Sequence, residues 1–191
     1  MAPIHLFDYY YYREASPEEF GAFYSAHHQR MFEHLIAIPL EPYMTGAELQ
    51  RRQEYDAMVS AMYELRLFIL HKDEVIGWHV GRQAQRDSAN MSNTALFDPH
   101  RGRGVYSAVI RAALELYRAQ GFGRVLSKHH ASNNAVLIPK LRAGFQITGF
   151  EIDERYGLFV NLTYFFNEQR RNTYRFRTGA LRPDEEISKY L

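Results

Sequence analysis

The stretch Arg101-Gly102-Arg103-Gly104-Val105-Tyr106 decides the fold of this chain of 191 residues. It joins an apolar, strand-like run that ends at Phe97 to a helix that begins almost at once. A strand that passes through two glycines into a helix directs free backbone N–H groups and the positive end of the helix dipole at one point. Glycine lets the backbone approach an anion closely, and arginine can bind a phosphate through two hydrogen bonds. The stretch therefore predicts a binding site for a small anion such as a diphosphate.

The segments after this stretch alternate between helix and strand. Apolar residues recur at helical spacing over residues 105–117, so one face of this helix is expected to pack on a sheet. Gly121 suits the left-handed position that ends a helix. A strand is expected over residues 124–128, and a short helix is expected from about Asn134 until just before Gly144.

These motifs, taken in order, resemble the GCN5-related N-acetyltransferase superfamily, whose acetyl-CoA loop reads Arg/Gln-x-x-Gly-x-Gly/Ala. Arg101 and Gly104 match the pattern, and Tyr106 departs from it at the last position. The superfamily's next landmark is an asparagine about a dozen residues before a Leu-Gly-Phe-like ending. Asn133 takes that place before Ala143-Gly144-Phe145. The resemblance covers roughly residues 67–166 and implies an α/β fold of the acyl-CoA N-acyltransferase type, with a mixed, mostly antiparallel central sheet flanked by helices.

The resemblance also implies an enzyme that transfers an acetyl group from acetyl-CoA to an amine of unknown identity. No nucleophile for a covalent intermediate is visible, so the transfer is expected to be direct, through a ternary complex. The residues implied to bind acetyl-CoA fall in three groups. Leu96 and Phe97 pair with the pantetheine arm, and Asn133 holds the distal arm or the region of the sulfur. The pyrophosphate is cradled by the loop made of Arg101, Gly102, Arg103, Gly104, Val105 and Tyr106.

One departure bears on catalysis. Many members of the superfamily have a tyrosine five residues before the final phenylalanine, where it can protonate the departing thiolate, and this chain has Lys140 there, after Pro139. The missing tyrosine keeps a second hypothesis open, an acyl-CoA-binding or protein-interaction module with reduced catalysis on the same fold. Lys140, Tyr106 or solvent could replace the missing acid. Pro139 is expected to kink its helix or to hold Ile138 in a non-helical conformation.

Transfer to an amine also requires a group that removes a proton. The candidates near the expected site are His129, His130, Asp98 and Glu151. His130 is the candidate catalytic residue, because it lies close before Asn133 and histidine titrates near neutral pH. A structural or solvent-facing role for the two adjacent histidines stays open.

Composition limits the other classes of function. The formal charge of +1 disfavours a nucleic-acid partner or an adaptor for one, and the 46% apolar content suffices for a core. With no cysteine, the chain has no disulfide, no thiolate nucleophile and no cysteine-bound zinc, and we expect no metal site. No signal-peptide pattern and no membrane span are visible, so we expect a cytoplasmic protein. The expected partner is a small-molecule or peptide amine, and a homodimer stays open.

The remaining segments predict one domain. A single acetyltransferase-like domain is expected over residues 1–166, and residues 167–191 are expected to form a peripheral C-terminal extension, either a strap or a mobile tail. Strand is also expected over four further runs, namely 4–12, a hairpin of 67–70 with 75–80, 91–97, and a hairpin of 147–152 with 158–166. Capping patterns predict helices from Ser16 to about His34 and from Thr45 to about Tyr63, which are expected to shape the acceptor site.

Overall fold

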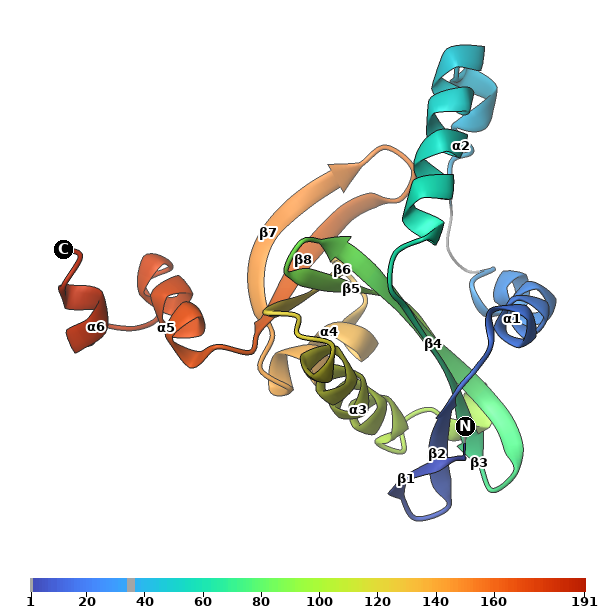
Figure 1. Cartoon of the computed structure of the whole chain (residues 1–191), viewed down its shortest axis with the longest axis horizontal. Coiled ribbons are helices and arrows are strands. Elements are labelled where there is room, and N and C mark those ends of the chain that lie inside the picture. Colours follow the sequence, from blue (N-terminus) through green and yellow to red (C-terminus); the bar gives the residue numbers. More distant parts are fainter. Residues whose placement is uncertain (1, 34–36) are drawn as a thin grey trace.

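The computed structural model describes residues 2–33 and 37–191. Its centre is an eight-stranded sheet with the order β1-β2-β3-β4-β5-β6-β8-β7 (Figure 1). The β5–β6 pair is parallel and the other pairs are antiparallel, which confirms the predicted mixed, mostly antiparallel sheet. The strands are β1 Ile4–Phe7, β2 Tyr10–Glu14, β3 Glu64–His71, β4 Glu74–Gln85, β5 Ser88–Leu96, β6 Arg124–His130, β7 Gln146–Asp153 and β8 Gly157–Phe165.

Helices cover both faces of the sheet. They are α1 Pro17–Met31, α2 Gly46–Ser60, α3 Val105–Ala119, α4 Asn134–Arg142, α5 Glu168–Arg177 and α6 Glu185–Ser188. On one face Phe20 of α1 packs with Phe68 and Trp78 of the sheet. On the other face α3 packs into two apolar clusters through residues such as Val109 and Tyr117. No helix in the described ranges has the length and apolar character needed to cross a bilayer.

The N-terminal run forms a hairpin and not the single strand predicted over residues 4–12. Asp8 adopts a φ of 45° in the turn between β1 and β2. Aspartate tolerates this left-handed conformation better than most residues, because its short polar side chain can bond locally. The turn carries no glycine or proline, so the sequence gives little sign of it. After the turn, Tyr10 and Tyr12 are buried in the core.

The two front helices begin where their caps predict. The hydroxyl of Ser16 accepts the N–H of Glu19 at 3.1 Å, and Thr45 forms a complete capping box with Glu48. α1 ends at Met31, and the predicted end at about His34 lies outside the described residues. α2 ends at Ser60, before the predicted Tyr63. Its end comes early because the carbonyl of residue 63 already accepts a strand-like hydrogen bond, from the N–H of Gln83 at 2.8 Å.

Helix α4 contains Pro139 and continues through it, so the expected non-helical conformation of Ile138 is wrong. The residues on either side of this pair, Leu137 and Lys140, are buried against the core. This packing holds the chain in a helix although proline donates no backbone hydrogen bond.

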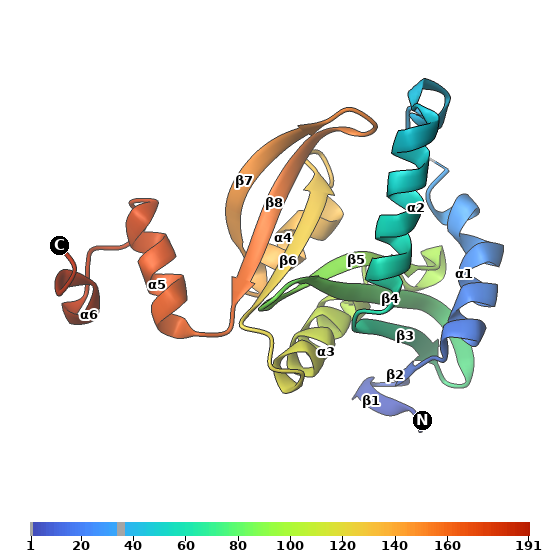
Figure 2. The same cartoon turned by 45° about the horizontal axis from the view of Figure 1, so that its top comes forward.

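The C-terminal segment forms α5 and α6, which extend away from the sheet beyond the end of β8 (Figures 1 and 2). Arg170 of α5 holds Asp87 at 3.1 Å, and the hydroxyl of Tyr174 donates to the carbonyl of Ile147. The short α6 begins at Asp184, whose side chain accepts the N–H of Ile187 at 2.9 Å.

Candidate active site

The two halves of the sheet separate between β5 and β6. These strands pair only where residues 88–90 face residues 124–126, and beyond that point they diverge. A β-bulge marks the divergence, because Val80 pairs with Asn93 while the next residue, Gly81, pairs with Met91. Ser92 is the surplus residue, and such a bulge bends and twists its strand. Figure 2 shows β6, β7 and β8 rising away from β3, β4 and β5.

A cavity of about 830 Å³ lies where β5 and β6 diverge. It is larger than a second hollow, of about 500 Å³, that lies elsewhere on the molecule. Its walls come from both faces of the sheet. His28 and Phe32 line it on the α1 face, whereas Tyr106 of α3 and Lys140 of α4 line it on the opposite face. The cavity therefore passes through the gap in the sheet.

The inner edge of β5 offers backbone groups to this gap. The N–H of Phe97 donates to the carbonyl of Ile76 in β4 at 2.9 Å. Because backbone groups alternate in direction along an antiparallel strand, those of Leu96 point to the other edge, toward the gap. Of the two residues predicted to pair with pantetheine, Leu96 thus faces the gap and Phe97 faces β4.

The glycine-rich loop has the geometry predicted for an anion site. Gly102 and Gly104 have φ values of 71° and 82°, which glycine adopts far more readily than residues with a side chain, and no atom lies within 4 Å of the place where a Cβ would stand. Gly104 is the N-cap of α3 and brings no side chain to it. The first bond within the helix runs from the N–H of Ala108 to Gly104, so the N–H groups of residues 105–107 stay open.

The two arginines of the loop differ in their contacts. The guanidinium of Arg101 donates to the carbonyl of Leu96 at 2.8 Å and forms an ion pair with Asp98 at 2.7 Å. It therefore ties the loop to the end of β5. Arg103 is exposed at the tip of the loop. The charge of Arg103, together with burial and His71, holds the pKa of His100 below its ordinary value.

Tyr106 lies in the cavity wall. Its ring is half-buried and packs against both apolar clusters on the α3 face. Burial raises the pKa of its hydroxyl well above 10, so the group stays protonated at physiological pH. The side chain thus forms part of the core as well as of the wall.

The structure brings His130 and Asn133 together at the end of β6, and both line the cavity. Nδ1 of His130 lies 2.7 Å from the hydroxyl of Ser132, and its carbonyl accepts the N–H of Asn133 at 2.9 Å. Asn133 is the N-cap of α4, but its side chain does not cap the helix. Its amide is therefore available to a ligand.

The two acidic candidates are engaged elsewhere. Asp98 pairs with Arg101, and Glu151 pairs with Lys128 at 3.0 Å. Neither residue lines the cavity.

A buried polar group that the sequence analysis did not assemble lies beside the cavity. Nζ of Lys140 is 2.5 Å from the hydroxyl of Ser127 and 3.2 Å from Sδ of Met91. The same hydroxyl lies 2.7 Å from Nε2 of His129. Burial lowers the pKa of Lys140 to about 7, and burial together with the charge of Lys140 lowers the pKa of His129 to about 3.

Strand alternation was the signal that could have found part of this group. In β6, residues 125, 127 and 129 point to one face, and Val125 marks that face as the core. Ser127 and His129 therefore point toward α4, whereas His130 points toward the α1 face. The side chains of the two adjacent histidines thus point to opposite faces of the sheet.

The α1 side of the cavity is mostly aromatic. His28, Phe32, Tyr156 and Phe159 line it, and burial lowers the pKa of His28. Ala37 lines this side as well, and the next residue is tied to the turn between β7 and β8, because the N–H of Ile38 donates to the carbonyl of residue 155 at 3.0 Å.

An ion pair also ties the segment after residue 36 to the turn between β7 and β8. The carboxylate of Glu41 lies 2.8 Å from the guanidinium groups of both Arg155 and Arg52. These two arginines lower the pKa of Glu41 to about 2.

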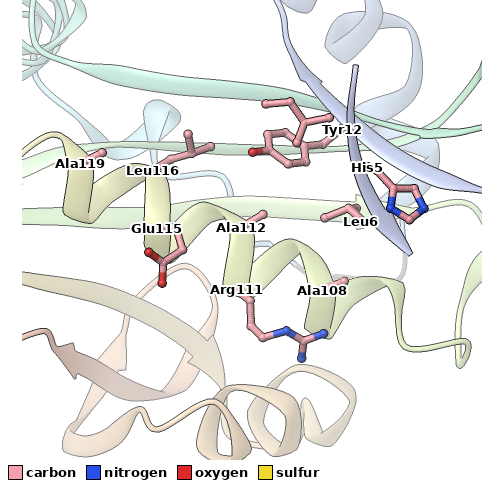
Figure 3. A pocket seen from close by; sticks show the side chains of 10 residues that line it. His5, Leu6, Tyr12, Ala108, Arg111, Ala112, Glu115, Leu116 and Ala119 are labelled. Atoms are coloured by element: carbon pink, nitrogen blue, oxygen red, sulfur yellow. The ribbon is translucent and has the colours of Figure 1, made fainter. Parts of the chain in front are cut away.

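A separate hollow of about 500 Å³ lies between β1 and α3 (Figure 3). Its floor is formed by Leu6, Tyr12 and alanines of α3, and Arg111 and Glu115 stand at its rim. It shares no lining residue with the cavity between β5 and β6. Of the candidate residues from the sequence, Tyr106, His129, His130, Asn133 and Lys140 line that cavity, and none lines this hollow.

Known proteins share this arrangement. A ribosomal alpha-N-protein acetyltransferase solved with coenzyme A has a TM-score of 0.63 at 17% identity, over 86% of this chain and 98% of its own. A ribosomal-protein-alanine acetyltransferase from Vibrio fischeri has a TM-score of 0.63 at 12% identity, over 88% and 98%. Ard1 from Thermoplasma volcanium has a TM-score of 0.58 at 21% identity, over 84% and 100%. No curated protein matches the chain.

The sequence model of the acetyltransferase (GNAT) family matches residues 21–145, which include α1, the glycine-rich loop and α4. The match covers the larger part of the chain and strands β3 to β6 of the sheet. The chain therefore belongs to the acetyltransferase (GNAT) family and is an acetyl-CoA-dependent N-acetyltransferase.

Proposed function

We propose that this enzyme transfers the acetyl group directly to an amine with an apolar or aromatic carbon frame, and that the transfer takes place in the cavity between β5 and β6. The observation that carries the proposal is the path of this cavity through the sheet. It meets the α3 and α4 face at one end and an aromatic wall at the other. The donor and the acceptor can therefore approach each other from opposite faces.

The residues at the donor end fit acetyl-CoA. The open N–H groups of residues 105–107 and the space beside Gly102 and Gly104 suit the pyrophosphate. The N–H of Leu96 points toward the gap and suits a carbonyl of the pantetheine arm, while the Leu96 carbonyl accepts a hydrogen bond from Arg101. Asn133 lines the cavity. When bound, acetyl-CoA supplies an acetyl group activated as a thioester. The cofactor-binding residues of the sequence analysis, including Phe97, Arg101, Arg103, Val105 and Tyr106, remain part of this proposal.

The chemistry of the acceptor end favours a monoamine over a polycation. Among the described lining residues, Asp153 is the one carboxylate. It is already held by Lys128 at 3.5 Å and by the N–H groups of Arg155 and Tyr156. A polycation needs several free carboxylates, whereas Phe159 and Tyr156 can contact an apolar or aromatic frame.

His130 would remove the proton from the amine. It lies on the α1 face, where the acceptor enters, and its Nδ1 is oriented by Ser132 at 2.7 Å. Ser127 does not offer a nucleophile for an acetyl-enzyme, since it is 2% exposed and its hydroxyl is engaged by Lys140 and His129. A direct transfer follows.

Calorimetry with acetyl-CoA and with CoA, followed by a thiol-release assay on a panel of amines, tests this function. We expect micromolar binding, and turnover of arylalkylamines such as phenethylamine in preference to spermidine. Preference for spermidine would overturn the acceptor class. Binding without turnover of any amine would favour the module with reduced catalysis, and no binding of CoA at millimolar concentration would overturn the donor site.

We also propose that residues 1–166 form the catalytic unit and that residues 167–191 are a peripheral extension. No residue of α5 or α6 lines the cavity. We expect Arg170→Ala, which removes the ion pair between α5 and Asp87, to leave CoA affinity and turnover unchanged. A loss of either would place the extension within the catalytic unit.

A further inference from the structure

We propose that Lys140 is the acid that protonates the sulfur of CoA as the acetyl group leaves, and that Ser127 and His129 position it for this role. The inference rests on the proposed transfer in the cavity between β5 and β6. It assigns a function to a buried polar group that core packing does not require.

The burial of Lys140 needs an explanation. The residue is 1% exposed, and within residues 2–33 and 37–191 it forms no ion pair. Its partners are the hydroxyl of Ser127, the sulfur of Met91 and the ring of Phe145, whose centroid lies 4.9 Å from Nζ. Taking an ammonium out of water without an anion is costly, and such sites are enriched at functional centres. An apolar residue of the same length would fill this space at lower cost.

The groups that face Lys140 supply no negative charge. His129 faces it from β6 and His79 from β4, and the charge of Lys140 helps to lower the pKa of each histidine to about 3. Both histidines are therefore neutral at physiological pH. Two tyrosines face this region from α3: Tyr117 forms a hydrogen bond with His79, and Tyr106 lines the same cavity as Lys140. Burial raises the pKa of both tyrosine hydroxyls, so they are also neutral. Near neutral pH, Lys140 can thus both hold and release a proton, since burial brings its pKa to about 7.

Lys140 lies on the side of the gap that suits the leaving group. It lines the cavity from α4, on the face that carries the glycine-rich loop, whereas His130 faces the α1 side. The acid and the base are therefore separated by the gap in which the acetyl group would sit. This order matches the direction of the reaction, from CoA on one face to the amine on the other.

The step balances without a further reactant. The amine nitrogen forms a bond to the acetyl carbon, and the C–S bond breaks with its electron pair going to sulfur. Lys140 Nζ gives one proton to that sulfur and becomes neutral, while His130 takes one proton from the nitrogen. Lys140 then regains a proton from solvent, and His130 returns one to it.

Ser127 and His129 act as positioning residues. The hydroxyl of Ser127 accepts a hydrogen bond from Nζ at 2.5 Å, and it can donate to Nε2 of His129 at 2.7 Å. A neutral imidazole accepts that proton because its pKa of about 3 keeps Nε2 unprotonated. The chain of bonds holds Nζ at the cavity wall and orients the hydroxyl oxygen toward it.

An NMR titration tests the contact with sulfur independently of activity. The chain has only four lysines, at positions 72, 128, 140 and 189, so the side-chain signal of Lys140 is assigned by its loss in Lys140→Met. In the free protein we expect this signal to titrate well below those of the other three lysines. CoA should raise the midpoint above that found with desulfo-CoA, because the thiol sulfur can accept a hydrogen bond from the ammonium and desulfo-CoA has no sulfur there. Equal midpoints with the two ligands would overturn the proposal even if no amine acceptor has been found.

Kinetics of variants test the role in transfer. Lys140→Met should lower kcat by about 100-fold or more with CoA affinity unchanged. Lys140→Tyr should restore much of the rate and move the alkaline limb of the pH profile upward, toward the pKa of tyrosine at about 10. Ser127→Ala should shift the alkaline limb and the NMR midpoint of Lys140 together. A Lys140→Met enzyme that binds CoA and retains the wild-type kcat would show that Lys140 is structural only, while the proposed acetyl transfer would stand.

Discussion

The hydroxyl of Tyr117 lies 3.0 Å from Nε2 of His79, and it reaches this nitrogen across the bare backbone of Gly81. Nδ1 of the same imidazole lies 2.7 Å from the hydroxyl of Thr94. A chain of buried polar groups thus runs from α3 through β4 to β5. Buried groups of this kind stabilise a fold only when every member has a partner, so the glycine is required by its neighbours.

Gly81→Ala should destabilise the protein by about 2 to 3 kcal/mol. A Cβ at this position would lie 1.9 Å from the Tyr117 oxygen and 2.6 Å from the Asn90 carbonyl, so the hydroxyl would be forced away from His79. Urea unfolding followed by circular dichroism measures the change. Gly149→Ala is the matched control, because its Cβ would come no closer than 3.9 Å to Asn161. Equal midpoints for the two variants would contradict the close approach.

Gly104→Asp should abolish binding of CoA. The new carboxylate would stand at the N-terminus of α3, where the pyrophosphate is proposed to lie, and two anions at one site repel each other. Isothermal calorimetry measures the affinity. Gly121→Asp is the control, because Gly121 has the same φ of 82°, lies at the other end of α3 and has open space around it. Unchanged affinity in Gly104→Asp would remove the loop from the donor site.

His130→Ala should lower kcat by about 100-fold with little loss of CoA affinity, because the imidazole is proposed to act on the amine and not on the donor. His5→Ala changes a histidine of β1 that does not line the cavity, and it should leave both constants unchanged. A wild-type rate in His130→Ala would exclude this residue as the base.

Stability should fall as the pH drops from about 6.5 toward 5. The pKa of His79 is about 3 in the folded protein and near the ordinary histidine value of 6.5 in the unfolded chain. Between these values the unfolded state binds a proton that the folded state does not, so acid favours unfolding, by about 1.4 kcal/mol per pH unit for one proton. Unfolding free energies at pH 7, 6 and 5 measure the slope. In His79→Gln the slope should be shallower, and an equal slope would mean that His79 is protonated in the fold.

Arg155→Ala should raise the KM for the amine and leave CoA affinity unchanged. This residue joins the turn between β7 and β8 to Glu41, in the segment that begins at Ala37 and borders the α1 side of the cavity. Arg52→Ala removes the other partner of Glu41 without touching the turn, and it should have the smaller effect. Steady-state kinetics with each substrate varied in turn separate the two constants. Equal effects of the two substitutions would argue against a role for the turn.

Local patterns were enough to predict most of the fold. The glycines of the loop, the apolar spacing of α3 and the capping box at Thr45 are each determined by a few neighbouring residues, and the structure confirms them. The turn at Asp8 escaped prediction because a non-glycine residue adopts its left-handed conformation. The non-helical conformation predicted for Ile138 is wrong, because the packing of α4 outweighs the local preference of Pro139.

The candidate site could be predicted only in part. His130 and Asn133 are close in sequence, so their meeting at the end of β6 could be foreseen. The contact between Lys140 and Ser127 depends on how α4 lies over the sheet, and no spacing along the chain gives that position. The directions of His129 and His130 follow from strand alternation, but their partners come from elements far apart in the sequence.

The surplus residue at Ser92 has a consequence for the whole of β5. Before it, Ala89 and Met91 face α3, and after it the even-numbered Thr94 and Leu96 do so. Deleting Ser92 would make Met91 and Asn93 neighbours in an unbroken ladder opposite Gly81 and Val80, and Thr94 would stay beside His79. Ser92 therefore bends β5 without fixing the register of the core, so a one-residue deletion is expected to straighten the strand and narrow the cavity between β5 and β6 while the pairing of the core is kept.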